Sequence, residues 1–147
     1  LTIQLKNHDW QKIYIAAVKN APPKTADSLT HFLAKNEKQN KSYVVKAETK
    51  NAKEARLSYR LLEKSDQYFL LEVILHTGRH HQIRAQLAAI GCPVKGDLKY
   101  GFNRSNPDGS ISLHAWKVTF THPISKEEIT VTAPPPAGQP WQFFNSL

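Results

Sequence analysis

The sequence contains no methionine and a single cysteine among 147 residues. One cysteine excludes an internal disulfide framework and a cysteine-based zinc site, and it indicates a reducing, cytoplasmic setting. No apolar run approaches the roughly 20 residues of a membrane-spanning helix, and the first residues do not resemble a signal peptide. An initiator methionine is not normally removed ahead of a leucine such as Leu1. We therefore expect the chain to be a piece of a longer protein.

Several signatures of common chemistries are also missing. The sequence has no P-loop, no glycine run for dinucleotide binding and no Gly-x-Ser-x-Gly elbow, so nucleotide-dependent and triad hydrolase chemistry lack their main support. His76, His80 and His81 crowd together, but no cysteine or carboxylate cluster accompanies them. We expect His80 and His81 to point in different directions on a helix. Ordinary hydrogen-bonding histidines are thus favoured over a metal site.

The composition instead favours a basic globular domain. Hydrophobic residues make up 40% of the chain and aromatic residues 10%, which is enough for one domain with its own core. Twenty Lys and Arg against twelve Asp and Glu give a net charge of +8. This balance favours a polyanionic partner such as nucleic acid, although a protein that is merely basic would show it too.

Hydrophobic patterning predicts an α+β fold, with a mixed, largely antiparallel sheet and a few short helices. Apolar and β-branched residues predict strands over residues 12–18, 42–48, 55–61, 68–75, 112–120 and 127–132. A helix is expected over 29–34, capped by Asp27 or Ser28 and with Leu29, Phe32 and Leu33 on one side. Residues 141–144 should pack back on the domain. The polar segment 35–41 is either a solvated connector or a loop that contacts phosphate.

Residues 76–84 connect a predicted apolar strand to a helix that carries two arginines and two histidines. Gly78 should allow the tight turn, and Thr77 is a plausible helix cap. Ile83, Leu87 and Ile90 recur at i, i+4 and i+7 and predict one buried stripe. Arg84 lies at the edge of this stripe, on the face shared with His80 and His81. A half-buried guanidinium there needs a carboxylate or phosphate partner.

Four motifs together resemble the RluA-type pseudouridine synthases. The longest is His76-Thr77-Gly78-Arg79-His80-His81-Gln82-Ile83-Arg84, followed by Gly91-Cys92-Pro93-Val94-Lys95-Gly96-Asp97 and Tyr100-Gly101. Lys12-Ile13-Tyr14 precedes them, and Leu113-His114-Ala115 leads on to His122-Pro123. The resemblance covers essentially the whole chain. It implies an enzyme that flips uridine out of RNA and isomerises it to pseudouridine without a metal or organic cofactor. Ribosomal RNA is favoured over transfer RNA as the substrate, but the sequence does not identify which of the two is modified.

The resemblance also implies roles for individual residues. Arg84 would hold the family's essential aspartate through a salt bridge, and Tyr14 would stack on the uracil and be placed for proton transfer. Ile83 and Leu113 would give apolar contact to the base. Without the resemblance, the alternative for Tyr14 is a strand tyrosine in the core. Arg79, His80 and His81 would either contact phosphates or brace the turn.

The family's essential aspartate lies in a His-Arg-Leu-Asp stretch that this chain does not contain. We therefore expect residues 1–147 to be the C-terminal portion of a catalytic domain, inactive alone, with the aspartate on an absent N-terminal portion. Arg84 would then await a carboxylate that this chain does not supply, and Asp97 would have a structural role. The alternative is a synthase-like module that binds RNA without catalysis.

Overall fold

The computed structural model describes residues 10–122 and 124–147, so Pro123 of the predicted His122-Pro123 motif lies outside the described residues. None of the described helices is long and apolar enough to cross a bilayer. The elements, in chain order, are β1 (Trp10–Val18), β2 (Ala26–Asn36), β3 (Lys41–Val45), β4 (Lys53–Lys64), β5 (Phe69–Leu75), α2 (Gln82–Ala89), η1 (Leu98–Tyr100), β6 (Leu113–Thr121), β7 (Glu128–Thr132) and η2 (Trp141–Phe143).

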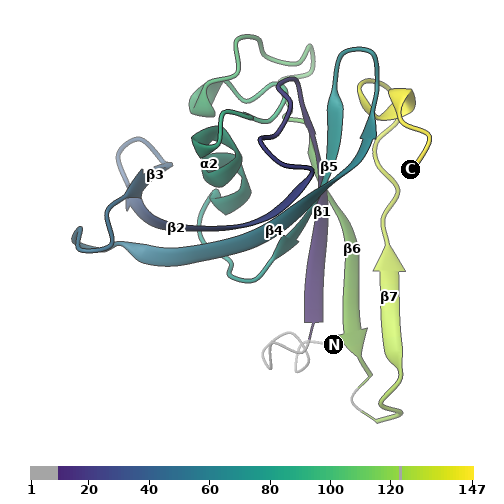
Figure 1. Ribbon diagram of the computed structural model, residues 1–147. Coiled ribbons are helices and arrows are strands. Elements are labelled where there is room, and N and C mark those ends of the chain that lie inside the picture. Colours follow the sequence, from purple (N-terminus) through teal and green to yellow (C-terminus); the bar gives the residue numbers. More distant parts are fainter. Residues whose placement is uncertain (1–9, 123) are drawn as a thin grey trace.

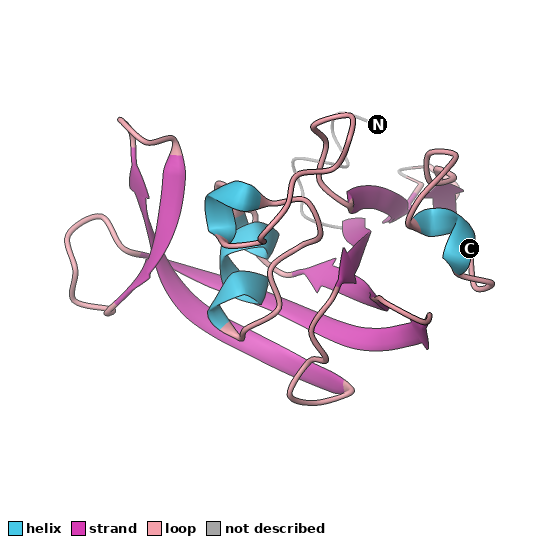
Figure 2. Ribbon diagram, turned by 90° about the horizontal axis from the view of Figure 1, so that it is seen from above, coloured by secondary structure: helices cyan, strands magenta, loops and turns pink. Residues whose placement is uncertain are grey.

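The strands form one seven-stranded sheet in the order β3-β2-β4-β5-β1-β6-β7. Every pairing among these strands is antiparallel. This arrangement confirms the predicted α+β class. In Figure 1, β3 and β7 lie at opposite edges of the sheet, and the long strands β2 and β4 curve beside α2. Viewed from above in Figure 2, α2 lies within the curve of these strands.

The sheet buries residues on both faces, and β1 shows how alternation divides them. Ala16 and Val18 join the core cluster that α2 covers, through Ile83 and Leu87. Ile15 and Ala17 point to the other face, where they pack with Leu70, Trp141 and Phe144. The C-terminal segment therefore packs back on the domain as expected, and its first part is the short helix η2. Alternating side chains on one strand thus hold a layer on each side of the sheet.

The predicted helix over residues 29–34 is wrong, because this segment belongs to β2. Leu29 and Leu33 are buried, and a spacing of four residues places two side chains on one face of a strand as well as of a helix. Pairing decides between the two, since β2 bonds to β3 on one side and to β4 on the other. Ser28 caps no helix. Its hydroxyl lies 3.1 Å from that of Ser58 on β4.

Candidate active site

The turn that leads into α2 is held by Gln82 rather than by a capping hydroxyl. The Gln82 amide oxygen accepts hydrogen bonds from the Thr77 hydroxyl at 2.8 Å and from the Arg79 N–H at 2.9 Å. Its amide nitrogen donates to the Arg56 carbonyl at 2.9 Å. The expected Thr77 cap is therefore wrong. The N-cap residue is His81, which makes no side-chain capping bond.

The left-handed residue of this turn is His81, with φ at 52°. Gly78 is not among the positive-φ residues, and a Cβ atom placed there would meet nothing within 4 Å. The expectation that Gly78 supplies the special backbone conformation is therefore wrong. Because α2 begins at Gln82, it carries Arg84 but neither of the histidines nor Arg79. A left-handed conformation is costly for a non-glycine residue, so the contacts of His81 must hold it there.

Arg84 has a carboxylate partner within the chain. Its Nε donates to Asp97 Oδ2 and its Nη2 to Asp97 Oδ1, both at 2.8 Å. The side chain of Asp97 is 1% exposed and that of Arg84 is 20% exposed. The hydrogen bonds to Asp97 raise the pKa of Arg84 against the opposing effect of its partial burial. The expectation that this chain does not supply a carboxylate for Arg84 is therefore wrong, because the loop between α2 and η1 brings Asp97 to it.

A third contact of Arg84 is the ring of His81. Arg84 Nη1 lies 3.1 Å from His81 Nε2, and since a guanidinium can only donate, Nε2 accepts. The neutral ring then carries its proton on Nδ1, which lies 2.8 Å from the Tyr100 hydroxyl. That hydroxyl also accepts from the Ser42 N–H at 2.9 Å. Burial and the charge of Arg84 lower the pKa of His81 to about 4, so the ring is neutral at physiological pH.

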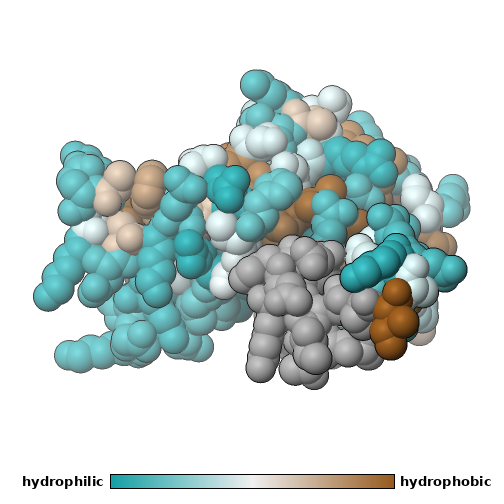
Figure 3. All heavy atoms as spheres, turned by 90° about the horizontal axis from the view of Figure 1, so that it is seen from below, coloured by the Kyte–Doolittle hydropathy of each residue, from teal (hydrophilic) through white to brown (hydrophobic). Residues whose placement is uncertain are grey.

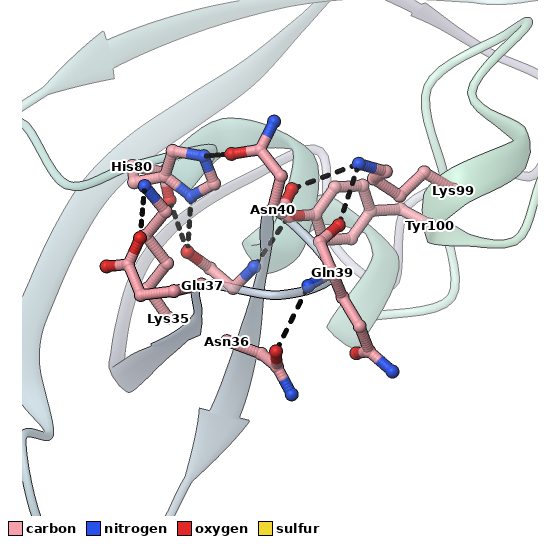
Figure 4. Close-up of polar contacts among 9 residues, drawn as sticks. Lys35, Asn36, Glu37, Gln39, Asn40, His80, Lys99 and Tyr100 are labelled. Atoms are coloured by element: carbon pink, nitrogen blue, oxygen red, sulfur yellow. Dashed lines mark hydrogen bonds and ion pairs between the residues drawn. The ribbon is translucent and has the colours of Figure 1, made fainter.

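His80 ties the same turn to the β2–β3 hairpin (Figure 4). Its Nε2 lies 3.0 Å from Asn40 Oδ1, and its carbonyl accepts from the Ser42 hydroxyl at 2.8 Å. Lys99 Nζ donates to the Gln39 and Asn40 carbonyls at 3.1 and 3.0 Å. The His80 and His81 rings stack with their centroids 3.7 Å apart, so the expectation that they point in different directions is wrong. Residues 37–40 therefore form a turn anchored to the segment just before α2 and to η1.

The predicted apolar contacts come together on the α2 face of the sheet. Ile83 belongs to the cluster under α2, and Tyr14 and Leu113 pack against the same cluster, both partly buried. Tyr14 lies on β1, opposite Val73 of β5. Leu113 also borders a hollow of about 540 Å³ beside Lys95, His114 and Trp141. No other predicted site residue lines that hollow. Arg84 follows Ile83 on α2, but it turns toward Asp97 and Tyr100.

Basic residues gather on the β2–β4 end of the sheet. Residues 35–60 carry eight Lys and Arg against three Glu, which is most of the net charge of the chain. Figure 3 shows this end as a largely hydrophilic surface. Arg79 reaches it from the turn and donates through Nε to the Glu54 carbonyl at 2.8 Å. The cations around this anchored turn offer a surface for a polyanion.

Sequence reasoning missed four residues of this network, namely Ser42, Gln82 and Asn40 as anchors and Tyr100 as the hub between Ser42 and His81. Tyr100 belongs to the motif Tyr100-Gly101, but the sequence analysis predicted no contact for its side chain. Its hydroxyl and ring are both used, since the ring centroid lies 4.9 Å from Arg84 Cζ. A buried tyrosine needs a partner for its hydroxyl, which is the signal that could have indicated it.

Comparison with known proteins assigns the chain to a family. The model of a family described as RNA pseudouridylate synthase matches residues 1–89, a range that includes Tyr14, Ile83 and Arg84. The chain belongs to this family.

Among the curated relatives, a ribosomal large subunit pseudouridine synthase D from Nitrosomonas europaea is 42% identical over 61% of this chain and 28% of its own length. An uncharacterized RNA pseudouridine synthase from Chloroflexus aurantiacus is 39% identical, over 86% of this chain and 39% of its own. A ribosomal large subunit pseudouridine synthase C from Buchnera aphidicola is 31% identical, over 89% and 44%. The chain thus spans less than half the length of each of these relatives.

Solved structures share the fold. Human RNA Pseudouridylate Synthase Domain Containing 1 superposes with a TM-score of 0.72 at 23% identity, over 92% of this chain and 58% of its own. Human RNA Pseudouridylate Synthase Domain Containing 4 gives 0.73 at 20% identity, over 92% and 62%.

Proposed function

We propose that the protein to which this chain belongs is an RNA pseudouridine synthase that isomerises uridine in structured ribosomal RNA. The observation that carries the proposal is the family match over residues 1–89, because it includes both proposed catalytic residues, Tyr14 and Arg84. The names of the relatives from N. europaea and B. aphidicola support the ribosomal substrate. The basic β2–β4 surface is suited to the RNA backbone. The lone buried Cys92 and such a substrate favour the cytoplasm.

The reaction rearranges one nucleoside. The bond from ribose C1′ to uracil N1 breaks, and C1′ then bonds to C5. N1 gains a proton and C5 loses one, so the balance needs no oxidant, reductant or organic cofactor. The target base must leave its stack to turn over in a pocket.

Each site residue has a separate role in this reaction. Tyr14 stacks on the uracil and is placed for proton transfer, and Ile83 and Leu113 give the base an apolar wall. Their packing against one cluster supports these roles. Arg84 holds the catalytic aspartate. The anchoring contacts of His80 and His81 favour bracing over phosphate contact, whereas the exposed Arg79 remains available to phosphate.

The aspartate belongs to another part of the protein. Residues 1–147 lack a His-Arg-Leu-Asp stretch, and the buried Asp97 is already paired with Arg84. We infer that this chain is the C-terminal portion of the catalytic domain, and that an N-terminal portion supplies the aspartate.

Tritium release from ribosomal RNA labelled at uridine C5 tests the proposal, because the isomerisation removes the hydrogen from C5 without any added co-substrate. The protein at its natural length should release tritium, and residues 1–147 alone should release none. Turnover by residues 1–147 alone would refute the need for an external aspartate. RNA binding in a gel shift without release by the natural-length protein would indicate a binding module instead.

A further inference from the structure

The guanidinium of Arg84 is held from three sides. Asp97 takes the Nε and one Nη2 hydrogen, His81 takes one Nη1 hydrogen, and the Tyr100 ring lies 4.9 Å from Cζ. A guanidinium has five N–H donors. Two therefore remain without an acceptor among the described residues, one on Nη1 and one on Nη2. A carboxylate has two oxygens with which to accept such a pair.

The difference in burial indicates that Asp97 is the fixed partner and that Arg84 is the group accessible to a ligand. Asp97 is 1% exposed, whereas Arg84 keeps 20% of its side chain accessible. Asp97 is itself held by its backbone, since its N–H donates to the Val94 carbonyl and its carbonyl accepts from the N–H groups of Tyr100 and Phe102. The loop beneath thus fixes the carboxylate, and the carboxylate fixes the guanidinium.

The state of His81 matters for the same reason. With Nε2 as an acceptor the ring can hold Arg84, whereas a protonated ring would present a second donor and a positive charge to it. The Tyr100 hydroxyl, itself bonded to the Ser42 N–H, holds the opposite edge of the ring and keeps the Nε2 lone pair directed at Nη1.

We propose that Asp97 and His81 are positioning residues that orient Arg84, so that its two remaining N–H groups meet the catalytic aspartate from the rest of the protein. This inference rests on the proposed function. It explains why a residue that already has a buried carboxylate partner can still bind a second one. Asp97 does not replace the catalytic aspartate, because it is inaccessible and both of its oxygens are used.

The test compares Asp97→Asn with Glu72→Gln in the natural-length protein. Glu72 is also buried and accepts from an arginine, Arg60 Nε at 2.7 Å, but it bonds to none of the groups around Arg84. Tritium release should show kcat lower by about tenfold to a hundredfold in Asp97→Asn with KM within about threefold, because a misplaced catalytic group costs rate more than binding. Glu72→Gln should keep the wild-type kcat.

Two further variants separate positioning from stability. Because Asp97 acts through Arg84, the double variant Asp97→Asn/Arg84→Gln should have the kcat of Arg84→Gln alone. Multiplying losses would overturn the proposal. If Asp97→Asn does not fold, His81 decides the matter. His81→Gln keeps an acceptor for Nη1 and should retain most of the wild-type kcat, whereas His81→Leu should lose it to a similar degree as predicted for Asp97→Asn.

The outcomes distinguish this inference from the function on which it rests. No tritium release from the wild-type protein would refute both. If the wild type releases tritium and folded Asp97→Asn has an unchanged kcat, the positioning role alone is refuted. Equal kcat values in His81→Gln and His81→Leu would refute it as well.

Discussion

Acidification should destabilise the protein through His81. In the folded chain the pKa of this ring is about 4, against 6.5 for an unperturbed histidine, because burial and the charge of Arg84 disfavour protonation. Above pH 6.5 the ring is neutral in both states and adds no dependence on pH. Between 6.5 and 4 the unfolded chain binds a proton that the folded chain does not. The free energy of unfolding therefore falls as the pH falls through this window, and the loss is complete below 4.

The size of the effect follows from the width of the window. A difference of about 2.5 pH units, at about 1.4 kcal/mol for each, gives an upper bound of roughly 3.5 kcal/mol. The ring is only partly buried. Solvent screening should therefore reduce the loss to about 1–2 kcal/mol.

Urea denaturation at pH 7 and pH 4.5 measures this loss in the wild type, in His81→Gln and in a matched control, His76→Gln. His76 is exposed and its ring bonds to the Ser58 hydroxyl. The change in unfolding free energy between the two pH values should be smaller in His81→Gln by about 1–2 kcal/mol and unchanged in the control. An equal change in all three proteins, or an NMR titration midpoint for His81 near 6.5, would refute the reasoning.

Two further predictions concern stability and are checked by urea denaturation. Gly78→Ala should change the unfolding free energy by less than about 1 kcal/mol, since the added Cβ meets nothing. Gly96→Ala should destabilise by clearly more, because Gly96 has φ at +86° and its Cβ would lie 2.7 Å from the Asn106 side chain. Equal effects would contradict this account of the two turns. Arg84→Ala should destabilise by about 3 kcal/mol, because Asp97 is left as a buried unpaired carboxylate. A loss below about 1 kcal/mol would show that Asp97 finds another partner.

Strand periodicity was readable because it repeats over many residues. On β4, Ala55, Leu57 and Tyr59 alternate with exposed or half-exposed residues and are all buried, as predicted. The apolar stripe of Ile83 and Leu87 was likewise correct for α2. The alternating positions on β4 fit a period of two. At α2 the step of three residues from Leu87 to Ile90, which packs against the same cluster, fits a period of 3.6 but not of two.

The predicted helix over residues 29–34 shows where periodicity is too short. Leu29 and Leu33 satisfy both periods, and only Phe32 favoured a helix; on β2 it is half-buried, unlike Leu29 and Leu33. The strands that decide the matter come later in the chain. Local sequence cannot weigh hydrogen bonds that depend on the register of β4.

The partner of Arg84 was not predicted for a related reason, because the contact is not local in the sequence. Arg84 was expected to need an anion and it has one, but Asp97 lies 13 residues away, beyond the end of α2. Helical spacing predicts contacts three or four residues apart, such as that between His81 and Arg84. Contacts made through loops, such as those of Asp97 and Tyr100, depend on how Gly96 and the η1 turn direct the chain. The sequence therefore indicated which residue needed a partner, but not where the partner lies.

The anchoring of the β2–β3 hairpin has a mechanical consequence. From the Ser42 N–H, an unbroken series of hydrogen bonds passes through the Tyr100 hydroxyl and the His81 ring to Arg84. A displacement of the hairpin by more than these bonds can stretch must either break one of them or carry the guanidinium along. A ligand that displaces the basic hairpin would therefore act on Arg84 through three hydrogen bonds, without touching the guanidinium itself.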